Sequence, residues 1–256
     1  MELEFVRVTH DGPVSRLTLA RPERRNALSL ALMQEVIAAL GDLPDDTQAV
    51  VVAGEGPAFS AGHDLDEMLD RDLAFYRELF DVCTQMMAIV HHIPQPVIAR
   101  VHGPAYAAGC QFVAACDLAV AADSATFATP GVKIGLFCST PMVPVSRAVG
   151  RKRAMEMLLT GEPISALTAQ EWGLVNRVVP AERLDDAVDE LVGQITRYSP
   201  HVVAIGKKAF YAQIELDERR AYDLAKSVIA SNAELDDAQE GMGAFVGKRQ
   251  PAWSNR

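Results

Sequence analysis

Short apolar runs alternate with longer amphipathic stretches through the first half of the chain. Residues 3–9 alternate apolar and polar side chains, His10-Asp11-Gly12 predicts a turn, and residues 14–19 continue as a second strand. Residues 49–53 and 97–101 are almost continuously apolar, as in strands that are buried on both faces. A loop containing glycine or proline and then a helical pattern follow these strands. This order predicts an α/β fold with a largely parallel sheet.

The helices of this half are predicted from apolar residues at helical spacing. Ser29 is a suitable N-cap for one helix, and a longer helix is expected over residues 73–90. The loop at residues 103–109 leads into a predicted helix over residues 111–116, and a strand is expected over residues 118–121. In open α/β folds, loops after the carboxyl ends of parallel strands carry the functional site. We therefore expect the chemistry of this chain in its glycine-containing loops.

The second half of the chain is mainly helical in pattern. We expect a helix over residues 147–160, a short helix over residues 168–172 and an extended segment over residues 175–179. Four further helices follow without intervening strands, over residues 181–196, 200–214, 218–231 and 234–248. We divide the chain into an α/β core over residues 1–195 and a C-terminal helical region over residues 196–256. That region is too thin to form a domain alone, so we expect it to pack on the core, on a neighbouring subunit or on both.

Composition and charge limit the partners. With 256 residues, of which 49% are hydrophobic, the chain can bury a sizeable core. Its formal charge of -10 argues against nucleic acid or an anionic membrane as a general partner. No apolar run approaches the about twenty residues that span a bilayer. Basic residues cluster at Arg24-Arg25, Arg151-Lys152-Arg153 and Lys248-Arg249, where an anionic small ligand can bind. The alternative for each cluster is an ordinary solvated surface.

The cysteines indicate a reducing environment. Cys83, Cys110, Cys116 and Cys138 lie in apolar surroundings and lack the spacing of a metal site. We therefore expect no bound metal, and we interpret Cys110 and Cys116 as small core residues of a reducing compartment. The N-terminal run Met1-Glu2-Leu3-Glu4 has neither a basic signal-peptide region nor a transit-peptide composition. On these grounds a cytoplasmic protein is expected.

Residues 105–115 are predicted to turn from a loop into a buried helix. Their small side chains let backbone N–H groups approach a ligand closely, and the start of a helix favours negative charge. No carboxylate occurs in this segment. The segment therefore offers a site that stabilises an oxyanion, without an obvious acid or base to create one.

Seven stretches in register now resemble the crotonase (enoyl-CoA hydratase/isomerase) superfamily. The first is Phe59-Ser60-Ala61-Gly62-His63-Asp64-Leu65, and the second is His102-Gly103-Pro104-Ala105-Tyr106-Ala107-Ala108-Gly109-Cys110. The others are residues 116–121, 127–130, 134–136, 159–166 and 169–180. Together they cover nearly the whole chain. Residues 60–65, 127–141 and 248–254 narrow the resemblance to one subgroup of the family.

The resemblance implies a fold and a ligand. The fold is a spiral of ββα turns with a C-terminal helical region that builds homotrimers, which often pair into hexamers. Members bind coenzyme A thioesters and use two backbone N–H groups to hold the thioester oxygen and stabilise an enolate. The matching positions are His63 and Ala108, with Gly109 as the next candidate. The acyl-CoA is then substrate or ligand, and no permanently bound cofactor is expected.

The usual catalytic carboxylates of the family are replaced in this chain. In the hydratases two glutamates activate a water, and these positions fall on Gln111 and Gly131, neither of which can take up a proton. Two-glutamate hydration and one-glutamate isomerisation are therefore not expected. Cys138 is a candidate nucleophile or weak base if its pKa is lowered, and otherwise a packed cysteine. The His63 imidazole is a candidate acid or base, and otherwise a loop side chain without a role.

Coenzyme A carries phosphates, which require cations. In the family, residues 59–65 and 102–110 would form the first and second oxyanion loops. The resemblance places the adenine of coenzyme A beside residues 24–27 and the first oxyanion loop. Arg24 or Arg25 is expected to make one phosphate contact, and Lys248 of the C-terminal helix, in the same or a neighbouring subunit, another. The remaining predicted contacts are Ala27, Ala61, Asp64 and Leu65.

Two classes of function remain open. The first is an enzyme of fatty acid metabolism, described as an enoyl-CoA hydratase or isomerase, that acts on acyl-CoA through a stabilised enolate. The second is a catalytically silent acyl-CoA-binding or oligomeric partner protein. The replaced glutamates favour the second, whereas the two retained oxyanion loops favour acyl-CoA chemistry or binding. Decarboxylation or thioester hydrolysis is a third possibility, since decarboxylation needs an enolate sink but less acid–base help.

Overall fold

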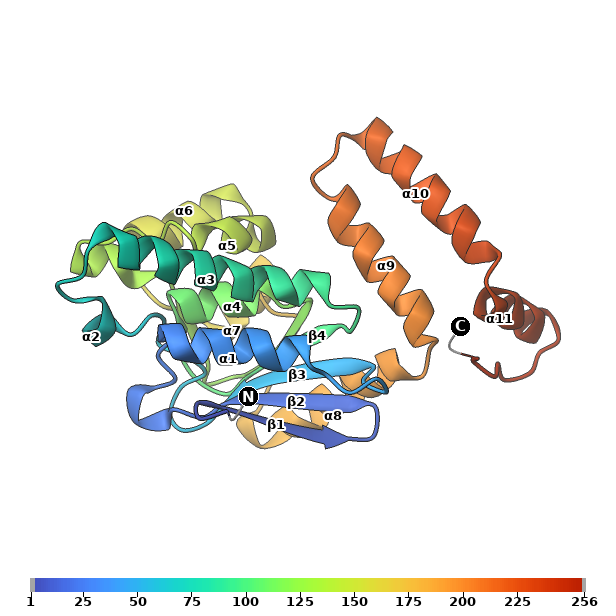
Figure 1. Cartoon of the computed structure of the whole chain (residues 1–256), viewed down its shortest axis with the longest axis horizontal. Helices are drawn as coiled ribbons and strands as arrows, with labels where there is room; N and C mark the ends of the chain where they lie inside the picture. Colours follow the sequence, from blue (N-terminus) through green and yellow to red (C-terminus); the bar gives the residue numbers. More distant parts are fainter. Residues whose placement is uncertain (1–2, 255–256) are drawn as a thin grey trace.

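A computed structural model describes residues 3–254 of the chain, so Met1, Glu2 and the last two residues lie outside the description. Its main sheet has the strand order β1-β2-β3-β4-β6-β9 (Figure 1). The strands are β1 (Val6–Asp11), β2 (Val14–Leu19), β3 (Ala49–Gly54), β4 (Val97–Val101), β6 (Leu118–Ala122) and β9 (Arg177–Val179). β1 and β2 form an antiparallel hairpin, and every later pairing in this sheet is parallel. The predicted α/β fold with a largely parallel sheet is confirmed.

The apolar run of β3 is explained by burial on both of its faces. Val50 and Val52 point into the larger core, and Ala49 and Val51 point into a second core on the opposite face. Successive side chains of a strand alternate between the faces, so a strand covered on both sides has no polar positions. In Figure 1 the helices α1 (Leu30–Gly41), α3 (Leu73–His92) and α4 (Ala108–Ala115) lie over one face, and α8 (Leu184–Thr196) lies on the other.

A second, small sheet holds the loops that carry the site. Its strands are β5 (Ala105–Tyr106), β7 (Thr126–Ala128) and β8 (Ile164–Ser165). The sequence pattern did not predict them, because two or three residues are too few for a periodicity to appear. Tyr106 pairs with Ala128, and Ser60 forms a bridge with Ala105. This sheet therefore ties together the chain before α2 (Leu65–Met68), the chain before α4 and the chain before η2 (Pro130–Ile134).

The helix predicted over residues 147–160 is two helices in the structure. α5 (Met142–Val149) ends at Gly150, and α6 (Arg151–Thr160) begins directly after it. Gly150 has a φ of +78°, which lies in the left-handed region that residues other than glycine rarely adopt. The apolar spacing continues across this break, so periodicity alone did not reveal it. The short helix η1 (Pro22–Arg24) lies in the loop before α1, α7 (Ala166–Trp172) precedes β9, and η3 (Ala181–Arg183) leads into α8.

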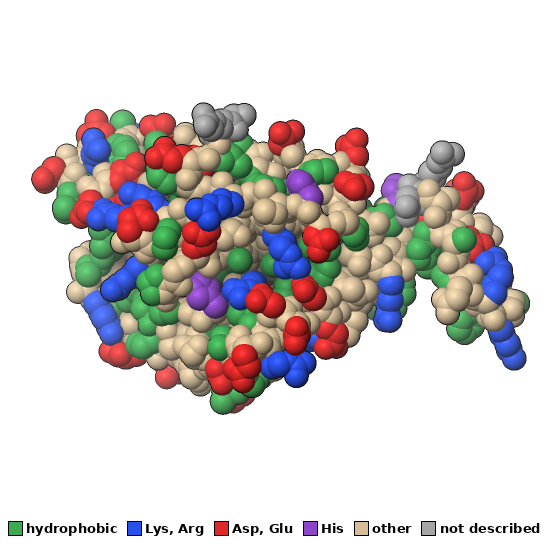
Figure 2. Space-filling view, turned by 90° about the horizontal axis from the view of Figure 1, so that it is seen from below, with side chains coloured by type: hydrophobic (Ala, Val, Ile, Leu, Met, Phe, Trp, Pro, Cys, Tyr) green, Lys and Arg blue, Asp and Glu red, His purple; other side chains and the backbone are tan. Residues whose placement is uncertain are grey.

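The last three helices form an arm that extends from the body of the molecule. We call α9 (Pro200–Gln213), α10 (Glu218–Ala233) and α11 (Asp236–Val246) the C-terminal arm. Figures 1 and 2 show it standing off from the body, with hydrophobic side chains on its surface. Neither α9 nor α10 has a buried residue among those described, and Phe245 of α11 is 86% exposed. An arm with so much apolar surface lacks a core of its own. The division of the chain at residues 195 and 196 stays a prediction.

The arm is attached to the body through a buried ion pair. The Lys207 ammonium of α9 lies 2.7 Å from the Asp117 carboxylate and donates to the carbonyl oxygens of Val90 and Gln95 at 2.6 and 2.8 Å. The Tyr211 hydroxyl donates to the other oxygen of Asp117 at 2.7 Å. Burial lowers the pKa of Lys207, and the neighbouring Asp117 opposes this effect. The start of the arm is therefore fixed to the body next to the end of α4.

Candidate active site

The loop before α1 is fixed by the side chain of Asn26. Its amide nitrogen donates to the carbonyl oxygens of Glu55, Ala58 and Phe59 at 2.9, 2.9 and 3.2 Å. Its amide oxygen accepts from the backbone N–H of Arg21 at 3.0 Å. Asn26 is completely buried, so these bonds satisfy polar groups that water cannot reach. These bonds hold the loop that contains Arg24 and Arg25 against residues 55–59, which lead into the first predicted oxyanion loop.

The first predicted oxyanion loop, residues 59–65, presents the amide of His63. Leu28 donates to the carbonyl oxygen of Gly62 at 2.7 Å and accepts from the amide of Asp64 at 3.3 Å, so His63 lies between two backbone bonds. Within residues 3–254, the His63 N–H has no acceptor. Gly62 has a φ of +96°, and a Cβ there would lie 2.8 Å from the Cβ of Ala107 and 3.2 Å from the nitrogen of Ala108. The glycine lets the two oxyanion loops approach each other closely.

The second predicted oxyanion loop, residues 102–110, presents the amide of Ala108, the first residue of α4. Ala107 has φ 49° and ψ −118°, an uncommon conformation for a residue with a side chain, and its amide donates to Ala128 at 2.9 Å. The N–H groups of Ala108 and Gly109 find no acceptor among the described residues, as expected for the first turn of a helix. A Cβ on Gly109 would lie 2.3 Å from the carbonyl oxygen of Ser60. Strained backbone and free amides therefore coincide at the start of α4.

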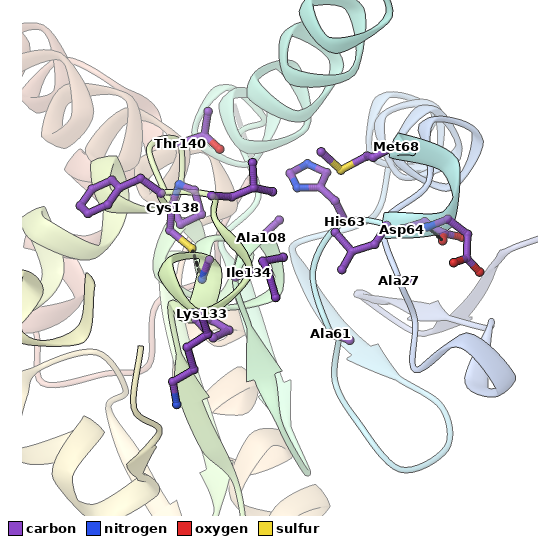
Figure 3. A pocket seen from close by; sticks show the side chains of 18 of the residues that line it. Ala27, Ala61, His63, Asp64, Met68, Ala108, Lys133, Ile134, Cys138 and Thr140 are labelled. Carbon is purple, nitrogen blue, oxygen red and sulfur yellow. Dashed lines mark hydrogen bonds between the residues drawn. The ribbon is translucent and has the colours of Figure 1, made fainter. Parts of the chain in front are cut away.

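Both loops border a cavity of about 930 Å³. Most of the predicted site residues line it: Arg24, Arg25, Ala27, Ala61, His63, Asp64, Leu65, Ala108, Gly131 and Cys138. Figure 3 shows them converging from the loop before α1, the two oxyanion loops and the segment after β7. The cavity is also lined by four large apolar side chains, those of Met68, Phe80, Ile134 and Phe137. The sequence reasoning missed these four, because an apolar residue that lines a cavity has the same pattern as one that fills a core.

Three predicted site residues do not line the cavity. Gln111 is 3% exposed within α4, and its amide oxygen accepts from the thiol of Cys83 at 3.9 Å. Gly109 packs against Ser60, as described above. Lys248 follows α11 at the end of the arm and is exposed. Within a single chain the structure therefore does not bring Lys248 to the cavity.

The side chain of Cys138 fills the space beside Gly131. The Gly131 amide donates to the Cys138 sulfur at 3.3 Å, and a Cβ on Gly131 would lie 2.9 Å from that sulfur. Burial raises the pKa of the Cys138 thiol, and the bond from Gly131 only partly opposes this. A nucleophilic role required a lowered pKa. Burial shifts the pKa of Cys138 in the opposite direction, and the role of Cys138 stays a prediction.

The ring of His63 projects into the wall of the cavity (Figure 3). It meets the edge of Phe80 with the ring centres 5.3 Å apart. Its Nε2 atom is buried and has no hydrogen-bond partner in the described part of the chain. Burial lowers the pKa of His63 to about 4, so the ring is neutral at pH 7. His63 thus contributes a free backbone amide and an uncharged imidazole to the same site.

The charged side chains of the cavity lining come from residues 23–25 and 64–66 and from Lys133. The buried carboxylate of Asp64 accepts from Arg21 at 2.8 Å and from Arg24 at 3.1 Å, and Arg24 also pairs with Asp66. Burial alone would raise the pKa of Asp64, but the two arginines outweigh it and hold that pKa below its usual value. Arg25 forms no ion pair with any described residue. Arg25 is therefore the arginine that is free for an anionic ligand.

The cysteines are buried and unpaired. Cys83, Cys110, Cys116 and Cys138 are all free thiols, and the burial of Cys110 and Cys116 confirms their interpretation as small core residues. Burial raises the pKa of Cys83 and of Cys110 to about 12. In residues 3–254, no three histidine, cysteine, aspartate or glutamate side chains are grouped so that they could hold a metal ion.

Comparison with known proteins identifies close relatives. The family model described as Enoyl-CoA hydratase/isomerase matches residues 9–256. The chain is 46% identical over 253 residues to the mouse protein named enoyl-CoA hydratase domain-containing protein 3, mitochondrial, and the match covers 96% of this chain and 82% of that protein. A crystal structure titled enoyl-CoA hydratase from Mycobacterium smegmatis has a TM-score of 0.96 and 48% identity, covering 98% of this chain and 99% of that one. That of human enoyl-CoA hydratase domain-containing protein 3 has a TM-score of 0.94 and 42% identity, covering 98% and 100%.

These relatives confirm the subgroup resemblance and correct the predicted location. The subgroup indicated by residues 60–65, 127–141 and 248–254 is that of enoyl-CoA hydratase domain-containing protein 3. The expectation of a cytoplasmic protein is wrong, because similar proteins from mouse, rat and human are named mitochondrial. Free cysteines indicate a reducing compartment but do not distinguish one such compartment from another. None of the helices described combines the length and apolar character needed to cross a bilayer.

Proposed function

Because the chain belongs to the enoyl-CoA hydratase/isomerase family, we propose that it binds an acyl-CoA thioester in the cavity and stabilises the enolate of its acyl group. The thioester oxygen lies between the backbone N–H groups of His63 and Ala108. The observation that carries this proposal is that both amides border one cavity and have no acceptor within residues 3–254. In most folded proteins buried amides are paired, so two free amides at one cavity indicate a ligand oxygen.

The arrangement suits an oxygen that gains negative charge. Ala108 begins α4, and the partial positive charge at the start of a helix adds to the attraction of its N–H. The two loops are fixed by backbone bonds and by the bridge between Ser60 and Ala105, so the donors need no rearrangement when charge develops. Removing one donor of this kind costs about 3–4 kcal/mol of transition-state stabilisation. Family relatives are named enoyl-CoA hydratases, and a lyase or isomerase of acyl-CoA in fatty acid metabolism is the first function proposed.

Hydration by two glutamates is not part of this proposal. Gln111 is buried away from the cavity, and the space beside Gly131 holds the Cys138 sulfur. The reaction must therefore use the enolate sink with a different proton carrier, or with loss of a carboxyl group. The pairing of Cys138 with Gly131 also favours a second candidate, a catalytically silent protein that binds acyl-CoA or acts as an oligomeric partner. In both cases coenzyme A enters as part of the ligand, and we propose no resident cofactor.

The phosphates of coenzyme A are proposed to bind at the mouth of the cavity. Arg25 is exposed there without an ion pair in the described chain, whereas Arg24 is shared between Asp64 and Asp66. Lys248 belongs to this proposal only if a neighbouring subunit supplies it. The exposed apolar residues of the arm, among them Phe210, Tyr222, Ile229 and Phe245, support assembly into a homotrimer or a hexamer of two trimers. Analytical ultracentrifugation distinguishes these states from a monomer.

Calorimetry tests the proposed function. We expect butyryl-CoA to bind with a Kd in the micromolar range, which corresponds to about −8 kcal/mol. Butyryl-pantetheine, which lacks the nucleotide and its phosphates, should bind more weakly. Arg25→Ala should weaken butyryl-CoA about three- to tenfold and leave butyryl-pantetheine unchanged. Arg183→Ala, which removes an exposed arginine outside the cavity, is the control. Absence of binding at millimolar concentration contradicts the proposal, and rapid hydration of crotonyl-CoA contradicts the exclusion of two-glutamate chemistry.

A further inference from the structure

We propose that the imidazole of His63 is the group that takes the proton from the α-carbon of the bound acyl-CoA. This inference rests on the proposed function, because it needs the enolate that the two oxyanion amides stabilise. It assigns to one residue two roles: the backbone N–H binds the thioester oxygen, and the ring accepts the proton.

The cavity offers few other proton acceptors. Its carboxylates are Glu23, Asp64 and Asp66. Each of the three forms an ion pair with Arg21 or Arg24. Asp64 is held by two arginines and lies with its side chain turned away from the cavity centre (Figure 3). Cys138 is protonated at neutral pH, because burial raises its pKa, and its sulfur already accepts from Gly131. A neutral imidazole, by contrast, carries one lone pair that accepts a proton.

The position of the ring fits this role. His63 supplies one oxyanion amide, so its ring and the thioester carbonyl are bound to the same residue of the chain. The ring lines the cavity opposite the segment that contains Cys138 and Thr140 (Figure 3). Its Nε2 atom is shielded from solvent, so a bound ligand meets the ring at Nδ1, which forms no hydrogen bond within residues 3–254.

The proposed step is balanced without a further reactant. A ring nitrogen of His63 takes the proton as the α C–H bond breaks. The electron pair of that bond moves into the Cα–C bond, and the thioester oxygen gains the negative charge held by the amides of His63 and Ala108. Return of a proton from the imidazolium to the α-carbon restores the thioester. In D₂O the imidazolium exchanges the abstracted proton with solvent and returns a deuteron, so repeated cycles replace the α-hydrogens.

The test is α-hydrogen exchange of butyryl-CoA in D₂O, followed by NMR on the full-length protein. We expect the wild-type protein to catalyse exchange. His63→Gln keeps the backbone amide, so it should bind butyryl-CoA with similar affinity while exchange falls by about 10²-fold or more. His92→Gln, which alters an exposed histidine on α3, is the matched control and should exchange at the wild-type rate. Cys138→Ala is compared with these two variants, because it removes the thiol that lines the cavity.

The outcomes separate this inference from the proposed function. If the wild-type protein binds butyryl-CoA and exchanges, but His63→Gln exchanges equally fast, the role of His63 is wrong and enolate formation stands. If the protein binds butyryl-CoA without any exchange, both the role of His63 and the enolate are contradicted. If the protein binds no acyl-CoA, the proposed function itself fails. Loss of exchange in Cys138→Ala, with exchange retained in His63→Gln, would assign the proton to the thiol and overturn the inference.

The pH dependence of the exchange rate tests the inference on the wild-type protein itself, so it does not require that any variant folds. Phe80 from α3 packs against the ring, and Met68 from α2 lies beside it in Figure 3. The titratable and charged groups that line the same cavity are Glu23, Arg24, Arg25, Asp64, Asp66, Lys133 and Cys138. Burial is the only cause that lowers the pKa of His63 to about 4. The base form is therefore complete by about pH 6, and exchange should be level from there to about pH 8. A rate that rises about tenfold per pH unit across this range would indicate a thiolate and overturn the inference.

Discussion

The sulfur of Cys138 occupies the space into which a side chain on Gly131 would extend. The Gly131 amide donates to this sulfur at 3.3 Å, and a Cβ on Gly131 would lie 2.9 Å from the sulfur and 3.0 Å from the carbonyl oxygen of Leu136. Distances under 3.0 Å are not tolerated without movement of one partner. A glutamate at position 131 therefore requires the Cys138 sulfur to move.

This close approach predicts a coupled pair of substitutions. Gly131→Ala should lower the free energy of unfolding by about 1–3 kcal/mol through overpacking, and Cys138→Ala in the same chain should recover much of that loss. Urea unfolding of the single and double variants measures the coupling. Gly193→Ala in α8 is the control, because nothing lies near a Cβ there and a helical alanine should stabilise by about 0.5–1 kcal/mol. Additive losses in the double variant would contradict the account.

Restoring a glutamate at position 111 should not restore hydration. Gln111 is 3% exposed, and its amide oxygen contacts only the Cys83 thiol among the hydrogen bonds of the described chain. In Gln111→Glu, burial raises the pKa of the new carboxyl group above its unfolded value of about 4.3. The free energy of unfolding should therefore be least affected below about pH 4 and should decrease as the pH rises through the raised pKa. Urea unfolding at several pH values tests this, and rapid crotonyl-CoA hydration by the variant would contradict it.

Acid should weaken the fold through His63. The ring has a pKa of about 4 in the folded protein and about 6.5 when unfolded, so between these values the unfolded chain binds more protons. The free energy of unfolding is then fully retained above about pH 6.5 and decreases as the pH falls, by up to about 3 kcal/mol near pH 4. His63→Gln should lose this component, while His91 and His102 contribute equally to both proteins. Identical pH dependence of the two proteins would show that the ring is not desolvated.

The sequence predicted the parts of the fold that depend on long patterns. The apolar runs of β3 and β4 and the Ser29 cap of α1 are where the pattern placed them, and Ser29 accepts from the amide of Leu32. The short strands β5, β7 and β8 and the break at Gly150 were missed, because they depend on backbone geometry over two or three residues. Local patterns carry no information of that kind.

The candidate site shows the same division. Motif resemblance located the loops around His63 and Ala108, because their residues are contiguous in sequence. It did not reveal that Cys138 fills the space at Gly131, since they lie seven positions apart and only the fold of η2 brings them together. Nor did it reveal that Gln111 lies outside the cavity, or that Arg24 is occupied by two aspartates whereas Arg25 is free. These relations arise from packing and charge pairing between distant segments.

The anchor of the C-terminal arm provides a further prediction. Lys207→Met should lower the free energy of unfolding by about 3–5 kcal/mol, because Asp117 then loses its buried cation while remaining partly shielded from water. Lys208→Met, at an exposed neighbouring position on α9, should change the free energy by less than about 0.5 kcal/mol. Denaturant unfolding compares the two variants, with ultracentrifugation reporting on assembly. Equal stabilities would mean that the arm is held by other contacts.

The most direct test of the central claim is the infrared spectrum of the thioester carbonyl in bound butyryl-CoA, with a ¹³C label at that carbon. If the amides of His63 and Ala108 both donate to the carbonyl oxygen, its stretching frequency falls on binding relative to free butyryl-CoA, because each donor draws charge onto the oxygen. The shift should persist in His63→Gln, which keeps both backbone donors. A carbonyl frequency that is unchanged while butyryl-CoA is demonstrably bound would show that the two amides do not form an oxyanion hole, and it would contradict the account.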